Sequence, residues 1–292
     1  MRLKKAYVEI TNQCNLSCPF CPRTMRAPRS MTEEEFSVVA HALSGIAESV
    51  FFHVKGEPLL HPLLGGFIDI AEAEGLSVTI TTNGTLLAER VGDLAHKGAL
   101  KRINASLHGL SQLEERAGET LEEIFDAADR IIKLNRDITP GFLVSYRLWT
   151  ADDAPATRFA AGKIAARYGI DAQGLVDSLS RKGGHKIHAN AAVHAAETFE
   201  WPSLDGEDYG ENGFCRGLRD QLGILSDGTV VPCCLDGEGI IALGNAFREG
   251  IAEILEGPRA RALYKSFTDR KIAEPLCRRC GYRTRFSAGA GD

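Results

Sequence analysis

The chain has 292 residues, of which 44% are hydrophobic and 25% are charged, as in an ordinary globular protein with one large or two modest domains. The formal net charge of -5 gives no general attraction to phosphate backbones, so no nucleic-acid partner is expected. No apolar run is long enough to span a membrane, so no membrane partner is expected either. The eight cysteines fall into two sets, three before residue 22 and five after residue 214.

The N-terminus carries Arg2, Lys4 and Lys5 close behind Met1, and no apolar segment follows them. A secretory signal peptide needs such a segment, so none is expected. We therefore predict a cytoplasmic protein whose cysteines stay reduced rather than forming disulfides.

Strand-like and helix-like segments alternate through the first 180 residues. The predicted strands are Ala6 to Ile10, Val50 to Val54, Leu76 to Thr81, Arg102 to Leu107, Phe142 to Leu148 and Gly174 to Leu179. The predicted helices are Thr32 to Leu43, which opens with a capping-box pattern, Leu63 to Ala73, Leu86 to Lys97, Leu121 to Leu134 and Ala156 to Tyr168. Because each helix must cross the sheet before the next strand can pair, the alternation predicts an α/β fold with a parallel sheet.

Three cysteines, Cys14, Cys18 and Cys21, follow directly after the first predicted strand. Three thiolates can bind three irons of a 4Fe-4S cluster, which leaves one iron open to an outside molecule. The alternative is a zinc site, but a closed zinc site needs four ligands, and no histidine or fourth cysteine lies nearby in the sequence.

The CxxxCxxC spacing, with Phe20 just before the third cysteine, resembles the radical S-adenosylmethionine (SAM) superfamily. The resemblance implies that the open iron binds SAM and that one electron cleaves SAM to a 5′-deoxyadenosyl radical, which takes hydrogen from a substrate carbon. It also implies a partial (β/α)6 TIM-like barrel over residues 1–182, with the reactive groups at the C-terminal ends of the strands.

Further segments at predicted strand ends resemble the SAM-binding elements of this family. Lys55 stands where the first glycine of a Gly-Gly-Glu-Pro segment is usual, and His108 replaces the usual aspartate of a Ser-Leu-Asp-Gly segment. The resemblance implies SAM contacts from Gly56, Glu57, Thr82, Asn83, Ser106 and His108. Arg147, at the end of the fifth predicted strand, is a further candidate because its guanidinium can pair with a carboxylate. Two alternatives stay open, since residues 81–85 also read as a helix-capping turn and Arg147 as an ordinary surface arginine.

Residues 183–212 interrupt the pattern and are predicted to form a linker or lid. They contain His185, His188 and His194, but no carboxylate or cysteine is interleaved among them. We interpret these histidines as structural or solvent-exposed rather than as a metal site.

The second cysteine set comprises Cys215, Cys233, Cys234, Cys277 and Cys280. Residues 224–232 read as a hairpin with an Asp227-Gly228 turn, which lets Cys215 and Cys233 approach one site, and a helix is predicted over residues 251–267. Four ligands would be Cys215, Cys233, Cys277 and Cys280, although Cys234 is adjacent and could replace Cys233. By themselves these four cysteines also fit zinc.

This region, residues 213–292, resembles the small α+β SPASM/Twitch domain of radical SAM enzymes, in its Twitch form with one auxiliary 4Fe-4S cluster. A fully cysteine-ligated cluster has no open iron, so its natural role is to pass electrons. That role favours dehydrogenation of a small molecule, and the plan is similar to that of the butirosin-pathway radical SAM dehydrogenase. The segment at residues 81–85 is also common in relatives of molybdenum-cofactor protein A.

Two other functions stay open. One is modification of a ribosomally made peptide by a thioether bond, a carbon–carbon crosslink or epimerisation; the first strand begins too near Met1 for a preceding leader-binding domain, which favours the small molecule. The other is a non-catalytic iron-sulfur electron carrier. Lys55, Arg147 and Arg181 are candidates for the catalytic base, and flavodoxin or ferredoxin is expected as reductant because no flavin or nicotinamide motif is present.

Overall fold

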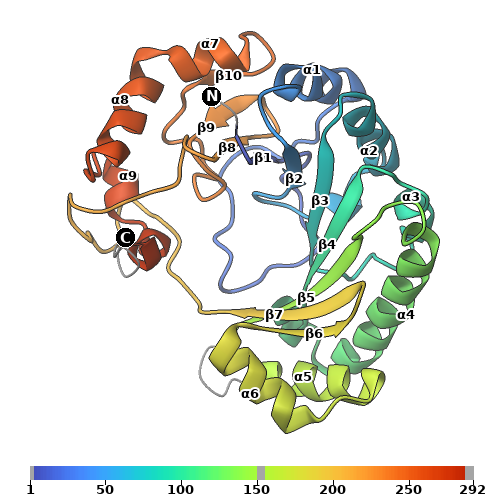
Figure 1. The fold of residues 1–292 in the computed structure, drawn as a ribbon. Coiled ribbons are helices and arrows are strands. Elements are labelled where there is room, and N and C mark those ends of the chain that lie inside the picture. Colours follow the sequence, from blue (N-terminus) through green and yellow to red (C-terminus); the bar gives the residue numbers. More distant parts are fainter. Residues whose placement is uncertain (1–2, 150–154, 287–292) are drawn as a thin grey trace. The chain divides into compact units, whose positions relative to one another are not determined.

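The computed structural model describes residues 3–149 and 155–286 (Figure 1). These residues form two compact units. Of the described residues, unit 1 combines 3–56, 73–76 and 199–286, and unit 2 combines 57–72, 77–149 and 155–198. Within the described part of the chain, no helix is long and apolar enough to cross a membrane.

Unit 1 is organised around its first strand, β1 (Lys5–Val8), which pairs in parallel with both of its neighbours. One neighbour is β2 (Ser49–Phe52) and the other is β8 (Gln221–Ile224), more than 200 residues away in the sequence. The sheet continues antiparallel through β9 (Thr229–Val231) and β10 (Gly244–Asn245). The hairpin predicted around Asp227-Gly228 is therefore confirmed, and it is built directly onto the strand that precedes the first three cysteines.

The helices of unit 1 are α1 (Glu33–Leu43), α7 (Ile251–Glu256), α8 (Pro258–Thr268) and α9 (Pro275–Arg278), followed by a 3-10 turn over Gly281–Phe286. The predicted capping box of α1 is confirmed, because Thr32 accepts a hydrogen bond from the Glu35 backbone and Glu35 accepts one from the Thr32 backbone. The single helix predicted over residues 251–267 is instead two helices. Gly257 is extended and Pro258 begins α8, where a proline needs no backbone donor.

Unit 2 contains four parallel strands in the order β3 (Ser77–Thr82), β4 (Leu100–Ser106), β5 (Leu143–Trp149) and β7 (Ala191–Ala196). Antiparallel β6 (Gly184–His188) pairs with β7. Along β5 the side chains alternate, with Val144, Tyr146 and Leu148 almost fully buried, while Arg147 on the opposite face is only half-buried. One face of this sheet is therefore apolar and the other is polar.

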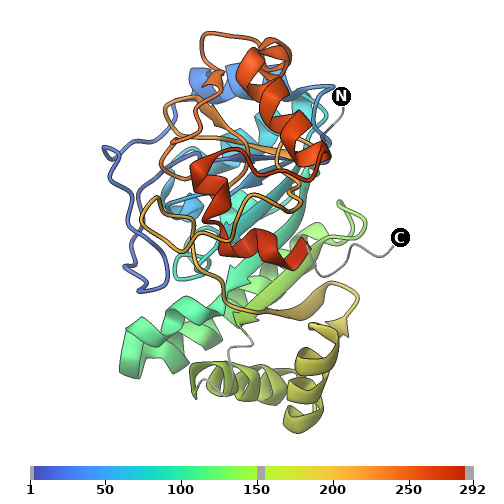
Figure 2. The same ribbon diagram turned by 90° about the vertical axis from the view of Figure 1, so that its left-hand side faces the viewer.

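The helices of unit 2 are α2 (Leu64–Ala73), α3 (Val91–Leu94), α4 (Ala117–Asn135), α5 (Pro155–Tyr168) and α6 (Ala172–Lys182), with 3-10 turns over Pro58–Leu60 and Leu107–Arg116. Helix α4 buries an apolar stripe that includes Ile124 and Phe125, and it packs against β5. Helices α5 and α6 lie side by side in both views (Figures 1 and 2).

Two predictions about residues 174–196 are wrong. Gly174 to Leu179 is not a strand but part of α6, whose N-cap Asp171 accepts a hydrogen bond from the Gly174 backbone at 2.6 Å. Leu175 and Leu179 are buried one helical turn apart, so the apolar spacing was helical. The first part of the predicted linker is the β6–β7 hairpin, and β7 occupies the sheet position beside β5.

At Gly56 the backbone of another segment approaches closely. Its φ is +75°, and an added Cβ would lie 2.3 Å from the Thr11 carbonyl oxygen and 2.8 Å from that of Gln13. Gly56→Ala should therefore lower the free energy of unfolding by at least about 2 kcal/mol, from left-handed strain plus the clash. Gly66→Ala is the matched control, because nothing lies within 4 Å of its Cβ position in α2, and it should be neutral or stabilise by up to about 1 kcal/mol. Equal effects of the two changes in urea denaturation would contradict this account.

Candidate active site

The loop that follows β1 carries Cys14, Cys18 and Cys21. Cys14 is exposed and the other two thiols are half-buried. The base of the loop is closed by Asn12, whose Nδ2 donates to the Ala27 carbonyl at 2.8 Å and whose Oδ1 accepts from the Arg29 backbone at 2.8 Å. The cysteines therefore project from a loop whose two ends are joined by one buried side chain.

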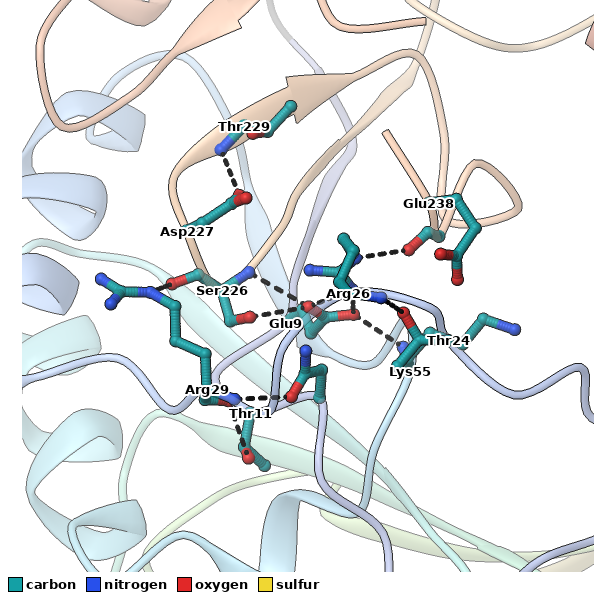
Figure 3. Close-up of polar contacts among 12 residues, drawn as sticks. Glu9, Thr11, Thr24, Arg26, Arg29, Lys55, Ser226, Asp227, Thr229 and Glu238 are labelled. Atoms are coloured by element: carbon teal, nitrogen blue, oxygen red, sulfur yellow. Dashed lines mark hydrogen bonds and ion pairs between the residues drawn. The ribbon is translucent and has the colours of Figure 1, made fainter. Parts of the chain in front are cut away.

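Glu9 is the residue on which this loop, the end of β2 and the C-terminal hairpin converge (Figure 3). Glu9 is 1% exposed, and Arg26 Nη2 donates to its two carboxylate oxygens at 2.6 and 2.7 Å. It also accepts from the Ser226 backbone and hydroxyl, at 3.1 and 3.0 Å, and from the Lys55 backbone at 3.2 Å. Burial raises the pKa of Glu9 above its ordinary value, while Arg26 and Ser226 oppose that shift.

Lys55 is buried, and its ammonium group is directed at the cysteine loop. Lys55 Nζ donates to the Pro22 carbonyl at 2.7 Å and lies 4.3 Å from the centre of the Trp201 ring. Burial lowers the pKa of Lys55, and the nearby Cys21 is the strongest of the opposing influences. Lys55, which replaces the usual glycine, therefore places a positive charge beside the cysteine loop that follows β1.

Glu57 connects two of the predicted SAM-binding segments, both in unit 2. Its Oε1 accepts from the Leu59 backbone at 2.9 Å and its Oε2 from the Asn83 backbone at 2.7 Å. Burial raises the pKa of Glu57 to about 7. The carboxylate is thus committed to the protein backbone, and any contact with a cofactor from this segment falls to backbone groups.

The Thr82-Asn83 segment forms a tight turn. Thr82 Oγ1 accepts from the Gly84 backbone at 2.9 Å, and Asn83 Oδ1 accepts from the Thr85 backbone and hydroxyl at 3.0 and 2.7 Å. The capping-turn interpretation thus describes what these side chains do within the protein.

Ser106, His108 and Arg147 come together at the ends of β4 and β5. Ser106 lies opposite Arg147 in the strand register. The His108 ring stacks on Trp149 with centroids 4.2 Å apart and planes 7° apart. Burial and the charge of Arg147 lower the pKa of His108 to about 4, so the residue that replaces the usual aspartate is neutral at pH 7.

Arg181, the third candidate base, lies in the last turn of α6. Its Nε donates to the Asp177 carbonyl of the same helix at 3.3 Å, and the residue is exposed. Arg181 thus lies on a helix of unit 2 and not at the end of a strand.

The second set of cysteines brings four thiols of unit 1 into electrostatic reach of one another. Burial raises the pKa of Cys215 to about 11, and it also raises the pKa values of Cys233, Cys277 and Cys280. Repulsion adds to this effect, from Cys280 at Cys215 and from Cys215 at both Cys233 and Cys277. Arg283 braces the CxxC segment by donating from Nε to the Cys277 carbonyl at 2.9 Å.

This donor set suits a positively charged metal group. Within the described residues, no three His, Cys, Asp or Glu side chains are gathered as closely as metal ligands. The raised pKa values of these neighbouring thiols mean that they lose their protons together only when a positive charge binds them. An iron-sulfur cluster supplies that charge. The four cysteines therefore fit such a cluster.

Cys234 has a different environment from its neighbour Cys233. It packs against the apolar cluster of Val54, Leu225 and Val231, and its side chain is hydrogen-bonded to that of Tyr7. Cys233 interacts electrostatically with Cys234, Cys215 and Cys277, whereas Cys280 is the one other cysteine of the set whose charge acts on Cys234. This difference favours Cys233 as the ligand.

Sequence reasoning missed Glu9 and Ser226, which organise the site from within. Both lie close to strand ends, but these two hydrogen-bond partners are 217 residues apart in the sequence. An acid placed at the end of an apolar run was the only local signal, and it does not identify a partner.

The described geometry is that of an α/β protein with one cysteine loop after its first strand and a second cysteine cluster built on a C-terminal hairpin. Residues 8–159 match the family model of the radical SAM superfamily, and residues 215–281 match SPASM, an iron-sulfur cluster-binding domain. The first match covers more than half of the chain, so the chain belongs to the radical SAM superfamily. Its predicted fold class, its two iron-sulfur clusters and its use of SAM are confirmed, and the zinc alternatives are set aside.

Individual relatives agree with this assignment. A GTP 3′,8-cyclase of Peptoclostridium acidaminophilum is 28% identical and spans 90% of this chain and 91% of its own. Among solved structures, BtrN in complex with AdoMet and 2-DOIA has a TM-score of 0.56 at 17% identity, covering 96% of this chain and 93% of that chain. Streptococcus suis SuiB bound to precursor peptide SuiA has a TM-score of 0.61 at 15% identity, covering 96% and 71%. The structural likenesses concern the fold alone.

Glu9→Gln tests whether one buried carboxylate organises the cluster loop. The change leaves Arg26 without its opposite charge, and breaking a buried ion pair in this way costs about 3 kcal/mol. We expect a lower free energy of unfolding together with reduced iron retention after anaerobic reconstitution. Glu253→Gln, at an exposed position of α7, is the control and should change neither quantity. If the two variants behave alike, Glu9 does not have this role.

Glu57 gives a prediction for pH dependence. Its pKa is about 7 in the folded chain and 4.5 ordinarily, so between these values the folded chain retains a proton that the unfolded chain releases. The stabilisation from Glu57 is thus fully present below pH 4.5 and is lost as pH rises to about 7. In urea denaturation, the free energy of unfolding of wild type should fall relative to that of the non-titrating Glu57→Gln variant as the pH rises from 5 to 7.5. A difference that is constant or shifts in favour of wild type would refute the assignment.

Proposed function

We propose that this radical SAM enzyme dehydrogenates a small molecule and that its auxiliary cluster receives the electron that the substrate loses. The observation that carries the proposal is a set of four half-buried thiols, each of which interacts electrostatically with at least one other of the set: Cys215, Cys233, Cys277 and Cys280. Four protein ligands leave no iron open, so this cluster is suited to electron transfer rather than to substrate binding.

The first cluster would be bound by Cys14, Cys18 and Cys21. When bound, the clusters and SAM supply one-electron chemistry, with cleavage of SAM to a 5′-deoxyadenosyl radical and an acceptor for the substrate's electron. The loop that carries the three ligands is joined to the C-terminal hairpin through Arg26, Glu9 and Ser226. This connection supports a shared architecture for the two cluster sites within unit 1.

The strand-end residues would position SAM and substrate. Ser106 and Arg147 offer a hydroxyl and a guanidinium at neighbouring strand ends. Neutral His108, stacked on Trp149, adds no charge there. Arg147 is suited to binding an anion, because a guanidinium does not give up its proton at neutral pH.

Of the candidate bases, Lys55 has the environment that best suits proton transfer, because burial lowers its pKa. Its Nζ donates to the Pro22 carbonyl, so accepting a substrate proton requires that it first be deprotonated and turn from this contact. In the overall reaction, one hydrogen of a carbinol carbon leaves with 5′-deoxyadenosine, the hydroxyl proton goes to the base and one electron goes to the auxiliary cluster. The product is a ketone.

A second candidate function is cyclisation of GTP, which is favoured by the 28% identity to a GTP 3′,8-cyclase over 90% of the chain. Peptide modification is a third, since SuiB was solved with a precursor peptide, but the identity to SuiB is only 15%. We further propose that flavodoxin or ferredoxin supplies electrons in the reducing cytoplasm that the cysteine usage predicts.

Product mass separates these functions. The reconstituted enzyme is incubated anaerobically with SAM, reductant and either GTP or a panel of small polyols and amino alcohols, and products are analysed by mass spectrometry. Dehydrogenation gives a product 2 Da lighter than its substrate, whereas cyclisation of GTP by isomerisation leaves the mass unchanged. A Cys277→Ala/Cys280→Ala variant should still form 5′-deoxyadenosine from SAM but yield no dehydrogenated product. A mass-neutral product from GTP, or full product formation by this variant, would overturn the proposal.

A further inference from the structure

A cavity of about 330 Å³ lies against the β6–β7 hairpin of unit 2. Its polar lining comes from His185, Lys186, His188 and His194, and the rest of its lining is glycine, alanine and Leu143. No acidic side chain lines it. In the strand register Lys186 and His194 share the face of Ala192, whereas His185 and His188 pair with Val193 and Ala191 and project to the other face.

Two arginines lie on the neighbouring strands, on the same sheet face as this cavity. Arg102 of β4 stands opposite Leu143, which lines the cavity, and Arg147 of β5 stands opposite His194. Residues paired in register project to the same side of a sheet. Ser145 lies between them on β5, and its Oγ is 2.7 Å from His194 Nδ1, which orients the imidazole.

Arg102 and Arg147 carry like charges that repel each other. Partial desolvation and the neighbouring Arg147 lower the pKa of Arg102, and partial desolvation, Arg102 and Arg147 lower the pKa of His194, although both side chains are exposed. Within the described residues, neither arginine forms an ion pair with a carboxylate. Arg167 of the same unit, by contrast, contacts Asp126 and Asp129 at 2.8 and 2.7 Å. An arrangement of like charges at a cavity is stabilised when an anion enters it.

We propose that Arg102, Arg147, Lys186 and His194 form a binding site for the phosphate or carboxylate group of a small anionic molecule. Guanidinium groups recognise both anions through paired hydrogen bonds, and the cavity volume suits a small molecule. The site deepens the proposed function and rests on it, because Arg147 lies at the strand end where the reaction would occur and the anion is then part of the substrate.

Anion binding is measured by isothermal titration on the reconstituted, SAM-loaded enzyme at low ionic strength. Inorganic tripolyphosphate is the phosphate probe, citrate the carboxylate probe and myo-inositol the uncharged control. At least one anion should bind at a single site while myo-inositol does not, and the tighter probe identifies the preferred group. Binding of neither anion by the wild-type enzyme would overturn the proposal.

Arg102→Gln tests the site itself, because this exposed residue is not among the predicted SAM contacts. Loss of one charge-assisted contact should weaken anion binding about tenfold. Arg130→Gln, at an exposed position of α4, removes the same charge elsewhere in unit 2 and should leave binding unchanged. Equal weakening in both variants would show a general charge effect and would overturn the proposal.

One further readout separates this site from the dehydrogenase proposal. Arg102→Gln should cleave SAM at the wild-type rate without substrate, which confirms that the radical machinery is intact. If anions bind through Arg102 but no product is 2 Da lighter, the dehydrogenase proposal fails and the anion site stands. If dehydrogenation occurs on uncharged substrates and is unaffected in Arg102→Gln, the anion site is refuted as a substrate site.

Discussion

The buried carboxylate of Glu9 is the interaction on which unit 1 depends. A charged group with 1% exposure is costly unless every oxygen is satisfied, and here two contacts from Arg26, two from Ser226 and one from Lys55 meet that need. Those partners come from the first cysteine loop, the C-terminal hairpin and the end of β2. The parallel pairing of β8 with β1 places Ser226 where it can take part. Separate stretches of sequence thus depend on one charge for their mutual position.

A second constraint acts at the C-terminal cysteines. The pKa values of four neighbouring thiols are raised, so these cysteines stay protonated until a metal group binds them. Hydrogen bonds from Arg283 to backbone carbonyls, including that of Cys277, hold the last segment in place without adding a ligand. The chain therefore provides the positions of the sulfurs and leaves their charge to be balanced by the cluster.

The sequence predicted those features that local patterns encode. Five of the predicted strands, the α1 capping box and the Asp227-Gly228 hairpin follow from periodicity and turn chemistry. The failures occurred where tertiary pairing decided the outcome. Gly174 to Leu179 is apolar enough for either state, and the Asp171 cap with buried Leu175 and Leu179 selected the helix. The short β6 and β7 strands are rich in Ala and His, and their pairing with β5 rather than their composition makes them strands.

The site was predictable to the same extent. Cysteine spacing indicated both cluster regions, but roles that arise from long-range contacts were not visible. Lys55 contacts Pro22 and Trp201, and Glu57 joins two motifs by accepting backbone hydrogen bonds, which no local pattern reports. The cationic face around Arg102 and His194 likewise exists only because the strand register places these residues together.

The central claim, that the chain holds two separate 4Fe-4S clusters with different roles, is tested most directly by counting iron and sulfide after anaerobic reconstitution. Wild type should contain about eight irons and cleave SAM after dithionite reduction. A Cys14/Cys18/Cys21→Ala variant should retain about four irons and form no 5′-deoxyadenosine. About four irons in wild type, with none left in the variant, would contradict the claim and leave the C-terminal cysteines without a cluster.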